Sequence, residues 1–294
     1  MKLQQEEVEL FYKLNWGLLY YANKKFDIIR NLSAPNLKGK NIEEITKLED
    51  KLFNGTKIIE DFIRENPLNF NYDELNIIRE WKNFIREEFF IFIEKDNAIF
   101  LTSEKEPKAY NVYGISEDIS EILPFEPYMV KATLLPFRGK IIYSGIFQGY
   151  SISFGSGMRK AVYKDFIKAK SSFGIIESLG LPLQRKKENN EELLKFYLKN
   201  EENRFEYENE ISNILKKEPL LTKTYYQELS KSNSRKLRKK ISDLNIKSGY
   251  FAVLNDVIIA SGKSEAEVKE SLKELLGERW EYAYIFKHGG RMKI

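Results

Sequence analysis

The chain has 294 residues, of which 42% are hydrophobic and 31% charged, and its formal net charge is +4. This length favours two domains or three small ones, and the apolar content is enough for buried cores, which excludes a disordered chain. It contains no cysteine and a single histidine, His288, so disulfides, thiolate nucleophiles, cysteine-bound zinc, iron–sulfur clusters and multi-histidine metal centres are excluded.

Residues 1–88 are predicted to form a helical N-terminal region. One apolar stripe at helical spacing consists of Leu10, Leu14, Leu18 and Tyr21. A second apolar series runs from Ile42 to Ile63 and predicts a second helix that ends near Pro67. Asp73 is the predicted N-cap of a third helix. Short connections between such helices favour antiparallel packing.

Residues 89–180 are predicted to form a mostly antiparallel sheet followed by a basic helix. The segments FFIFIE and AIFLT flank a turn, and YMVKATLL and KIIYSGIF flank the turn PFRG. KAYNVYGI and YSISF are predicted to add one strand each. Ser116 is expected to cap a short helix that ends at Leu123. The basic helix is predicted over 157–170, with Gly174 just beyond its end.

Residues 181–246 are predicted to be a charged helical connector, and residues 247–294 a small ββαβ module. In the module, GYFAVL and VIIASG are strands joined at Asn255-Asp256, and WEYAYIF is the third strand. Ser264 and Glu267 are predicted to form a capping box at the start of its helix. The whole chain is therefore expected to have an α+β fold.

The first candidate site is a glycine-rich turn before the basic helix, formed by Gly155, Ser156 and Gly157. The free N–H groups of a helix start can bind an anion. Phosphate contacts are predicted for the cations that follow, which are Arg159, Lys160, Lys164 and Lys168. The turn is neither a Walker loop nor a dinucleotide fingerprint, because Lys160 occupies the position of the third glycine. The alternative is a structural turn followed by a solvated helix face.

The second candidate site is a basic cluster whose members are Lys231, Arg235, Lys236, Arg238, Lys239 and Lys240. Between Lys223 and Lys247 there are eight basic and two acidic residues, which gives a local charge of +6. Such a cluster supports sequence-independent binding to a polyanion, and Tyr225 and Tyr226 could stack on bases. The alternative is a solubilising helix.

The remaining polar residues predict no further site. Adjacent acidic residues on a helix point about 100° apart and do not converge on one metal. His288 lies near the end of the chain and is expected to be a plain solvated residue. We therefore predict no catalytic residue, no metal and no cofactor.

The N-terminal segment and the first apolar run indicate where the protein acts. Met1–Glu9 is polar and acidic, which is unlike a secretion signal. The run Leu10–Ile29 contains too many polar residues to span a bilayer. We expect a cytoplasmic protein with no membrane partner. The richness in Lys, Glu and Ile is typical of heat-adapted microbes and of AT-rich genomes, so we expect an archaeal or bacterial origin.

The segment LLPFRGKIIYSG, followed by YSISFGSGMRK, resembles a motif of uncharacterised prokaryotic proteins. In those proteins the motif implies a helical N-terminal region, this β core and a variable C-terminal addition. Some relatives carry a tail that resembles a zinc-binding SEC-C module, which a chain without cysteine cannot reproduce. The tail from GYFAVL to KELL instead resembles a small archaeal and bacterial domain of unknown function. The two resemblances cover about half of the chain and imply no activity.

Three functions follow as hypotheses. The leading one is non-catalytic binding of RNA or DNA, or of a ribonucleoprotein, through the two basic groups. The second is a protein-interaction module in which the C-terminal ββαβ unit recruits a protein partner. The third is a metal-dependent phosphoryl-transfer enzyme or nuclease, whose carboxylates would have to come from distant segments.

Overall fold

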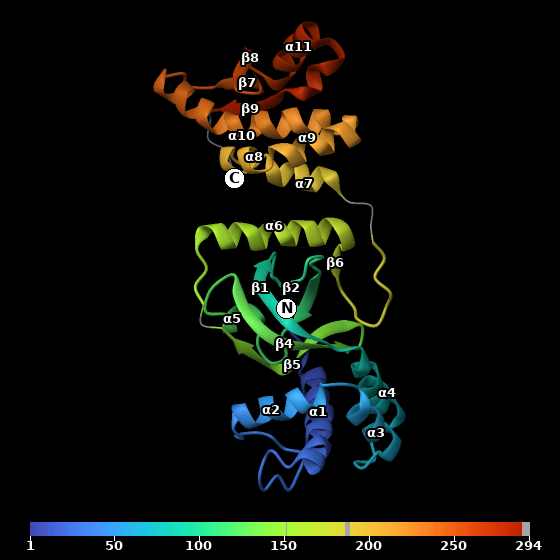
Figure 1. The fold of residues 1–294 in the computed structure, drawn as a ribbon. Coiled ribbons are helices and arrows are strands. Elements are labelled where there is room, and N and C mark those ends of the chain that lie inside the picture. The colour runs from blue at the N-terminus through green and yellow to red at the C-terminus, as the bar shows by residue number, and fades with distance from the viewer. Residues whose placement is uncertain (151, 186–188, 290–294) are drawn as a thin grey trace. The chain divides into compact units, whose positions relative to one another are not determined.

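The computed structural model describes residues 1–150, 152–185 and 189–289, and they form an α+β fold, as the sequence predicts. The chain divides into two compact units, Met1–Lys186 and Lys187–Ile294, and each is described by itself (Figure 1). The expected helical region and sheet both belong to the first unit. In the described part, no helix has the length and apolar character needed to cross a membrane.

The first unit begins with four α-helices and a 3-10 turn. They are α1 (Gln5–Phe26), α2 (Ile42–Leu52), α3 (Lys57–Glu65), α4 (Tyr72–Glu80) and η1 (Trp81–Asn83). The single helix predicted over 42–63 is two helices, because Gly55 adopts a φ of 157° between them. Asn71, rather than Asp73, caps α4: its Oδ1 accepts from the Glu74 N–H, and the Glu74 carboxylate accepts from the Asn71 N–H.

The sheet of the first unit closes into a barrel. Its strands are β1 (Ile85–Glu94), β2 (Asn97–Thr102), β3 (Ala109–Tyr113), β4 (Tyr128–Phe137), β5 (Lys140–Gly149) and β6 (Ile175–Ile176). The order β2-β1-β4-β5-β3-β6 is closed by an additional β2–β3 pairing. Most pairs are antiparallel, but β3 pairs parallel with both β5 and β6. With the short helix α5 (Ile119–Ile122) between β3 and β4, this is the connectivity of an OB-type Greek-key barrel.

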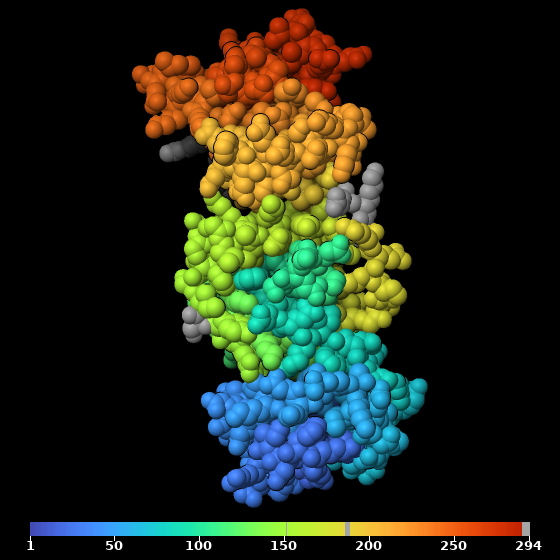
Figure 2. Space-filling view, viewed as in Figure 1, coloured from blue at the N-terminus to red at the C-terminus, as the bar shows by residue number. Residues whose placement is uncertain are grey.

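Aromatic side chains fill the barrel, and helices cover its outside. Phe89 packs on Phe100 with their ring centroids 5.7 Å apart. On one outer face, the Asn15 amide of α1 donates to the Ser144 carbonyl of β5 at 3.0 Å. Figure 1 shows the N-terminal helices next to β4 and β5, and Figure 2 shows the N-terminal region, in blue, packed against the rest of the first unit. On the opposite face lies α6 (Ser156–Phe173), whose Phe166 ring packs on Phe92 at 4.7 Å.

Two local predictions around the barrel are wrong. Residues 152–154 of the YSISF segment form no strand, since β5 ends at Gly149, whereas Ser151 lies outside the described residues. The short helix α5 is capped by Asp118 rather than by Ser116, because the Glu121 carboxylate reaches back to the Asp118 N–H.

The second unit consists of a group of helices followed by a three-stranded sheet and its own helix. Its helices are α7 (Asn190–Tyr197), α8 (Glu201–Glu206), α9 (Glu208–Lys217), η2 (Pro219–Leu221), α10 (Thr222–Asp243), α11 (Glu265–Leu276) and η3 (Gly277–Tyr282). Its strands are β7 (Gly249–Leu254), β8 (Val257–Gly262) and β9 (Tyr284–His288), in the antiparallel order β8-β7-β9.

Both faces of this small sheet are covered. Ile241 of α10 packs with Phe251 and Phe286 on one face. On the other face, Val268 and Leu272 of α11 pack with Ala252. The Ser264 hydroxyl caps α11, accepting from the Glu267 N–H at 3.2 Å, but the predicted capping box is only half formed, because the Glu267 carboxylate accepts from the Lys263 N–H at 2.8 Å. The helix α10 is therefore one layer of a helix–sheet–helix arrangement.

Candidate nucleic-acid interface

The helix α10 has one buried face and one exposed face. Its buried face carries two small polar residues, Ser230 and Ser234, beside Leu237 and Ile241. The Ser230 Oγ accepts from the N–H of Asn255 in the β7–β8 turn at 2.9 Å. Small side chains allow the turn to lie close to the helix backbone. Both buried hydroxyls are hydrogen-bonded, since the Ser234 hydroxyl donates to the Lys231 carbonyl at 2.7 Å. This fit fixes which cations of the helix face solvent.

Two of the six predicted cations on α10, Arg238 and Lys231, have partners in the second unit, and Arg238 joins two elements of the fold. The Arg238 guanidinium lies 4.3 Å from the centre of the Phe286 ring and donates to the Lys287 carbonyl at 2.8 Å. These contacts join α10 to β9. The Lys231 ammonium lies 3.4 Å from the Glu228 carboxylate, one turn earlier. Both cations already have partners inside the second unit.

The other four cations form the α10 basic face, defined here as Arg235, Lys236, Lys239 and Lys240. All four side chains are exposed. They form two pairs at i, i+4 spacing, so they lie on one side of the helix. Lys236 pairs with Glu201 of α8 at 2.6 Å, whereas the other three make no ion pair within the described part of the chain.

The Lys236–Glu201 pair is available for exchange. Its hydrogen bond to Lys236 holds the pKa of the Glu201 carboxyl below its usual range. The Lys236 and Glu201 side chains are 66% and 69% exposed, respectively. Exposed ion pairs of this kind contribute little stability and are screened by salt. A phosphate could therefore replace Glu201 as the partner of Lys236 at small cost.

A groove lies beside the α10 basic face, between α8, α10 and the β7–β8 turn. Its volume is about 510 Å³. We call it the α8–α10 groove; it is lined by Glu201, Arg204, Leu229, Asn233, Lys236, Leu237, Lys240, Asn255 and Asp256. Lys236 and Lys240 belong to both the groove and the basic face. The groove therefore adjoins the most cationic surface of α10.

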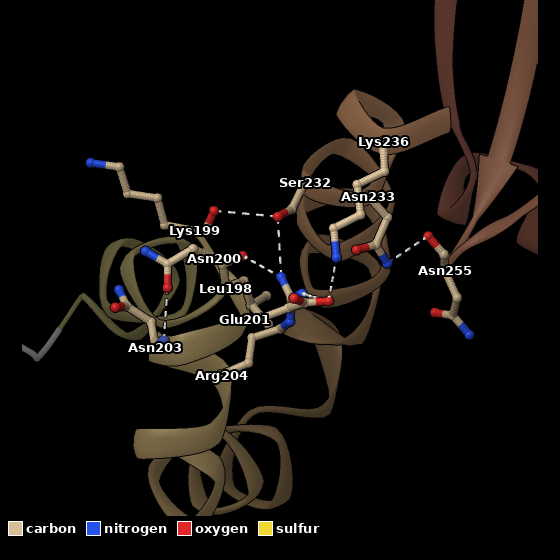
Figure 3. A network of polar contacts seen from close by, with 10 residues as sticks. All are labelled: Leu198, Lys199, Asn200, Glu201, Asn203, Arg204, Ser232, Asn233, Lys236 and Asn255. Atoms are coloured by element: carbon tan, nitrogen blue, oxygen red, sulfur yellow. Dashed lines mark hydrogen bonds and ion pairs between the residues drawn. The ribbon is translucent and has the colours of Figure 1, made fainter. Parts of the chain in front are cut away.

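The polar network in Figure 3 holds the walls of this groove. The Arg204 Nη1 donates to the Leu198 carbonyl at 3.2 Å and to the Ser232 Oγ at 3.1 Å, which ties α8 to α10. The Asn233 amide donates to the Asn255 carbonyl at 3.0 Å, which ties α10 to the β7–β8 turn. The side chain of Arg204 is only 18% exposed, so its position in the lining of the groove is fixed by packing and hydrogen bonds.

The glycine-rich turn lies in the first unit, at the start of α6. Gly155 is the N-cap with a φ of −68°, and it contributes no side-chain cap. A Cβ placed on Gly155 or Gly157 would meet no atom within 4 Å. Neither glycine is therefore required by backbone conformation or by crowding. The turn leaves the first N–H groups of α6, including that of Ser156, without a capping side chain.

The cations on α6 are less exposed than the sequence pattern implies. Lys160 and Lys164 are half-buried, while Arg159 and Lys168 are exposed. The Arg159 Nε donates to the Phe154 carbonyl at 3.1 Å. The two predicted basic groups belong to different units, so each is considered by itself.

His288 has a defined environment. It is the last residue of β9, its Nε2 lies 3.2 Å from the Ile246 carbonyl, and its ring packs edge-on to Phe251 at 6.3 Å. Across the described residues, no group of three or more His, Cys, Asp or Glu side chains could hold a metal ion. Neither observation adds a catalytic site.

Sequence reasoning selected only Lys236 and Lys240 among the residues of the groove, and it missed, among others, Arg204, Asn233, Asn255 and Asp256. They come from three segments that no local pattern connects. Asn255-Asp256 was recognised only as a turn pair, because turn chemistry accounts for both residues. A search for cations beside surface amides would have selected many other positions as well.

No family model, curated protein or solved structure matches this chain. The resemblance of the β core to uncharacterised prokaryotic proteins therefore stays a prediction.

Proposed function

We propose that the protein binds RNA or DNA, without catalysis, through the α10 basic face. The observation that carries this proposal is the concentration of four exposed cations on two turns of one helix, three of them without an ion pair in the described residues. Such cations attract the phosphate backbone of a nucleic acid. When they bind, they release the counterions that were condensed on those phosphates. The net charge of the whole chain is only +4, so a polyanion would be attracted by this local concentration of cations and not by the overall charge.

The barrel of the first unit supports this function less well. OB-type barrels bind oligonucleotides on the outer face of their second and third strands. In this chain that face is buried at Ile99, Leu101 and Ala109, and α6 packs against β3. Fold type alone does not bring a function, and here its usual binding face is covered.

A protein partner for the C-terminal module is the second candidate. The strand β8 is an edge of its sheet, and its first residue, Val257, is 57% exposed. An exposed edge strand can pair with an extended segment of another protein. A Val257→Lys variant should lose a protein partner captured by the wild type, whereas its nucleic-acid binding should not weaken. If the variant still captured that partner, this candidate would be ruled out.

Filter binding with single- and double-stranded RNA and DNA across a salt series tests the leading proposal. We expect binding at low salt that weakens steeply as the salt concentration rises. The absence of binding to all four nucleic acids at low salt would refute the proposal.

A further inference from the structure

We propose that the α8–α10 groove accepts one unpaired base of a single-stranded nucleic acid whose phosphates contact the α10 basic face. This inference rests on the proposed function and deepens it, because it selects single strands over duplexes and assigns a base-binding site. The volume of about 510 Å³ lies in the range typical of small-molecule sites, about 300–1,000 Å³.

The groove presents different chemistry at its two sides. Lys236 and Lys240 stand where it meets the basic face, so a phosphate bound there leaves its base beside the opening. Leu229 and Leu237 supply apolar surface for the face of a base ring. Asn233, Asn255 and Asp256 supply amide and carboxylate groups, which are the side-chain groups that recognise base edges by hydrogen bonds.

Asp256 gives the groove a preference among bases. Its side chain is exposed at the β7–β8 turn and makes no ion pair in the described residues. A carboxylate accepts a hydrogen bond from the exocyclic amino group of cytosine, whereas uracil carries a carbonyl oxygen at the same position. Cytosine and uracil have rings of equal size, so the groove should favour cytosine over uracil for this reason alone.

The groove should reject duplexes. A base can enter the groove only when it is unpaired, because a paired base stays stacked inside the duplex, and single-stranded segments are where proteins bind splayed-out bases. The walls do not need to form on binding, because Arg204 and Asn233 are already held by the Ser232 Oγ and the Asn255 carbonyl. A preformed site loses little conformational entropy when it is filled.

Fluorescence anisotropy on the full chain tests the inference. The probes are oligo-cytidine and oligo-uridine of about ten nucleotides, a span comparable to known single-strand sites, and a duplex of the same length. The variant is Asp256→Asn, and the matched control is Asp243→Asn, the same charge change at an exposed residue of α10 outside the groove. The ratio of affinities for the two oligomers cancels the general electrostatic effect of each substitution.

We expect the wild type to bind oligo-cytidine more tightly than the duplex, and more tightly than oligo-uridine by about fivefold to tenfold. Asp256→Asn should abolish the preference for cytidine, and Asp243→Asn should keep it. Equal binding of duplex and single strand, or an unchanged preference in Asp256→Asn, would overturn the inference while leaving the proposed function intact. Absence of binding to every probe would overturn both.

Discussion

Glu49, on α2, is a buried carboxylic acid in the first unit. The residue is 3% exposed and lies beside Ser144 of β5. One oxygen accepts from the Ser144 hydroxyl at 3.0 Å, while Oε1 has no partner in the described residues. Burial raises the pKa of this carboxyl to about 8, although the Ser144 hydrogen bond and Arg86 act in the opposite direction. Glu49 is therefore protonated in the folded protein at neutral pH.

This pKa shift predicts how Glu49 affects stability. The unfolded chain releases its proton near pH 4.5, so the stability contributed by the neutral carboxyl is complete below that pH and is lost as the pH rises through 8. Glu49→Gln stays neutral throughout. Between about pH 4 and pH 7 we expect the wild type to lose on the order of 3 kcal/mol in the free energy of unfolding, whereas Glu49→Gln does not show this loss. Urea unfolding at both pH values measures this.

The matched control is Glu43→Gln, which changes an exposed carboxyl of the same helix. We expect it to alter the free energy of unfolding by less than about 0.5 kcal/mol at either pH. If the wild type and Glu49→Gln lose stability in parallel as the pH rises, Glu49 is not the buried acid described here.

At the scale of the element, local signals predicted the order of elements in the C-terminal module, but the third strand, predicted to begin at Trp280, begins at Tyr284, because Gly277–Tyr282 is a 3-10 segment. The turn at Asn255-Asp256 and the cap at Ser264 act within a few residues, and both are present. The barrel closure was not predictable, because the parallel pairing of β3 with β5 joins Val112 to Ile141 across the chain. Parallel pairing leaves no turn signal between its partners.

The sequence also predicted only part of the site on α10. It showed that the helix is basic, but it did not show which cations contact other elements and which face solvent. Arg238 is engaged because Phe286 and Lys287 lie against it, and both are distant in sequence. Ser230 and Ser234 look like surface residues in the sequence, yet they are buried because a turn packs on them. On α6, by contrast, the apolar Met158 is 50% exposed.

The start of α6 gives a prediction about its glycines. Gly157 is helical and its missing Cβ would lie in open space, so Gly157→Ala should raise the free energy of unfolding by up to about 1 kcal/mol. Gly139 is the matched control: its surroundings are equally open, but its φ is +76°. Gly139→Ala should lower stability by about 1 kcal/mol because alanine is strained there. Thermal or chemical unfolding of both variants distinguishes the two effects, and a loss of stability in Gly157→Ala would contradict the account.

At the scale of the whole molecule, the two units have separate cores. The large core of the first unit joins the N-terminal helices to the barrel, whereas the sheet of the second unit packs between α10 and α11. A domain with its own core can fold alone. We expect fragments 1–186 and 187–294 each to give a cooperative unfolding transition by circular dichroism.

The same fragments locate the function. Nucleic-acid binding should follow fragment 187–294, which contains α10 and the groove. Fragment 1–186 should bind much more weakly, because its oligonucleotide-type barrel face is covered by α6. A folded fragment 187–294 without binding, beside a fragment 1–186 that binds, would assign the function to the first unit instead.

The most direct test of the central claim is the salt dependence of binding for two triple variants of the full chain. One is Arg235→Gln/Lys239→Gln/Lys240→Gln on the α10 basic face. The other removes the same charge from exposed lysines elsewhere in the second unit, as Lys216→Gln/Lys217→Gln/Lys263→Gln. Each lost phosphate contact lowers the slope of log affinity against log salt concentration by about 0.7–0.9. We predict a fall of about two to three for the α10 variant and little change for the control; equal slopes in the two variants would contradict the proposed interface.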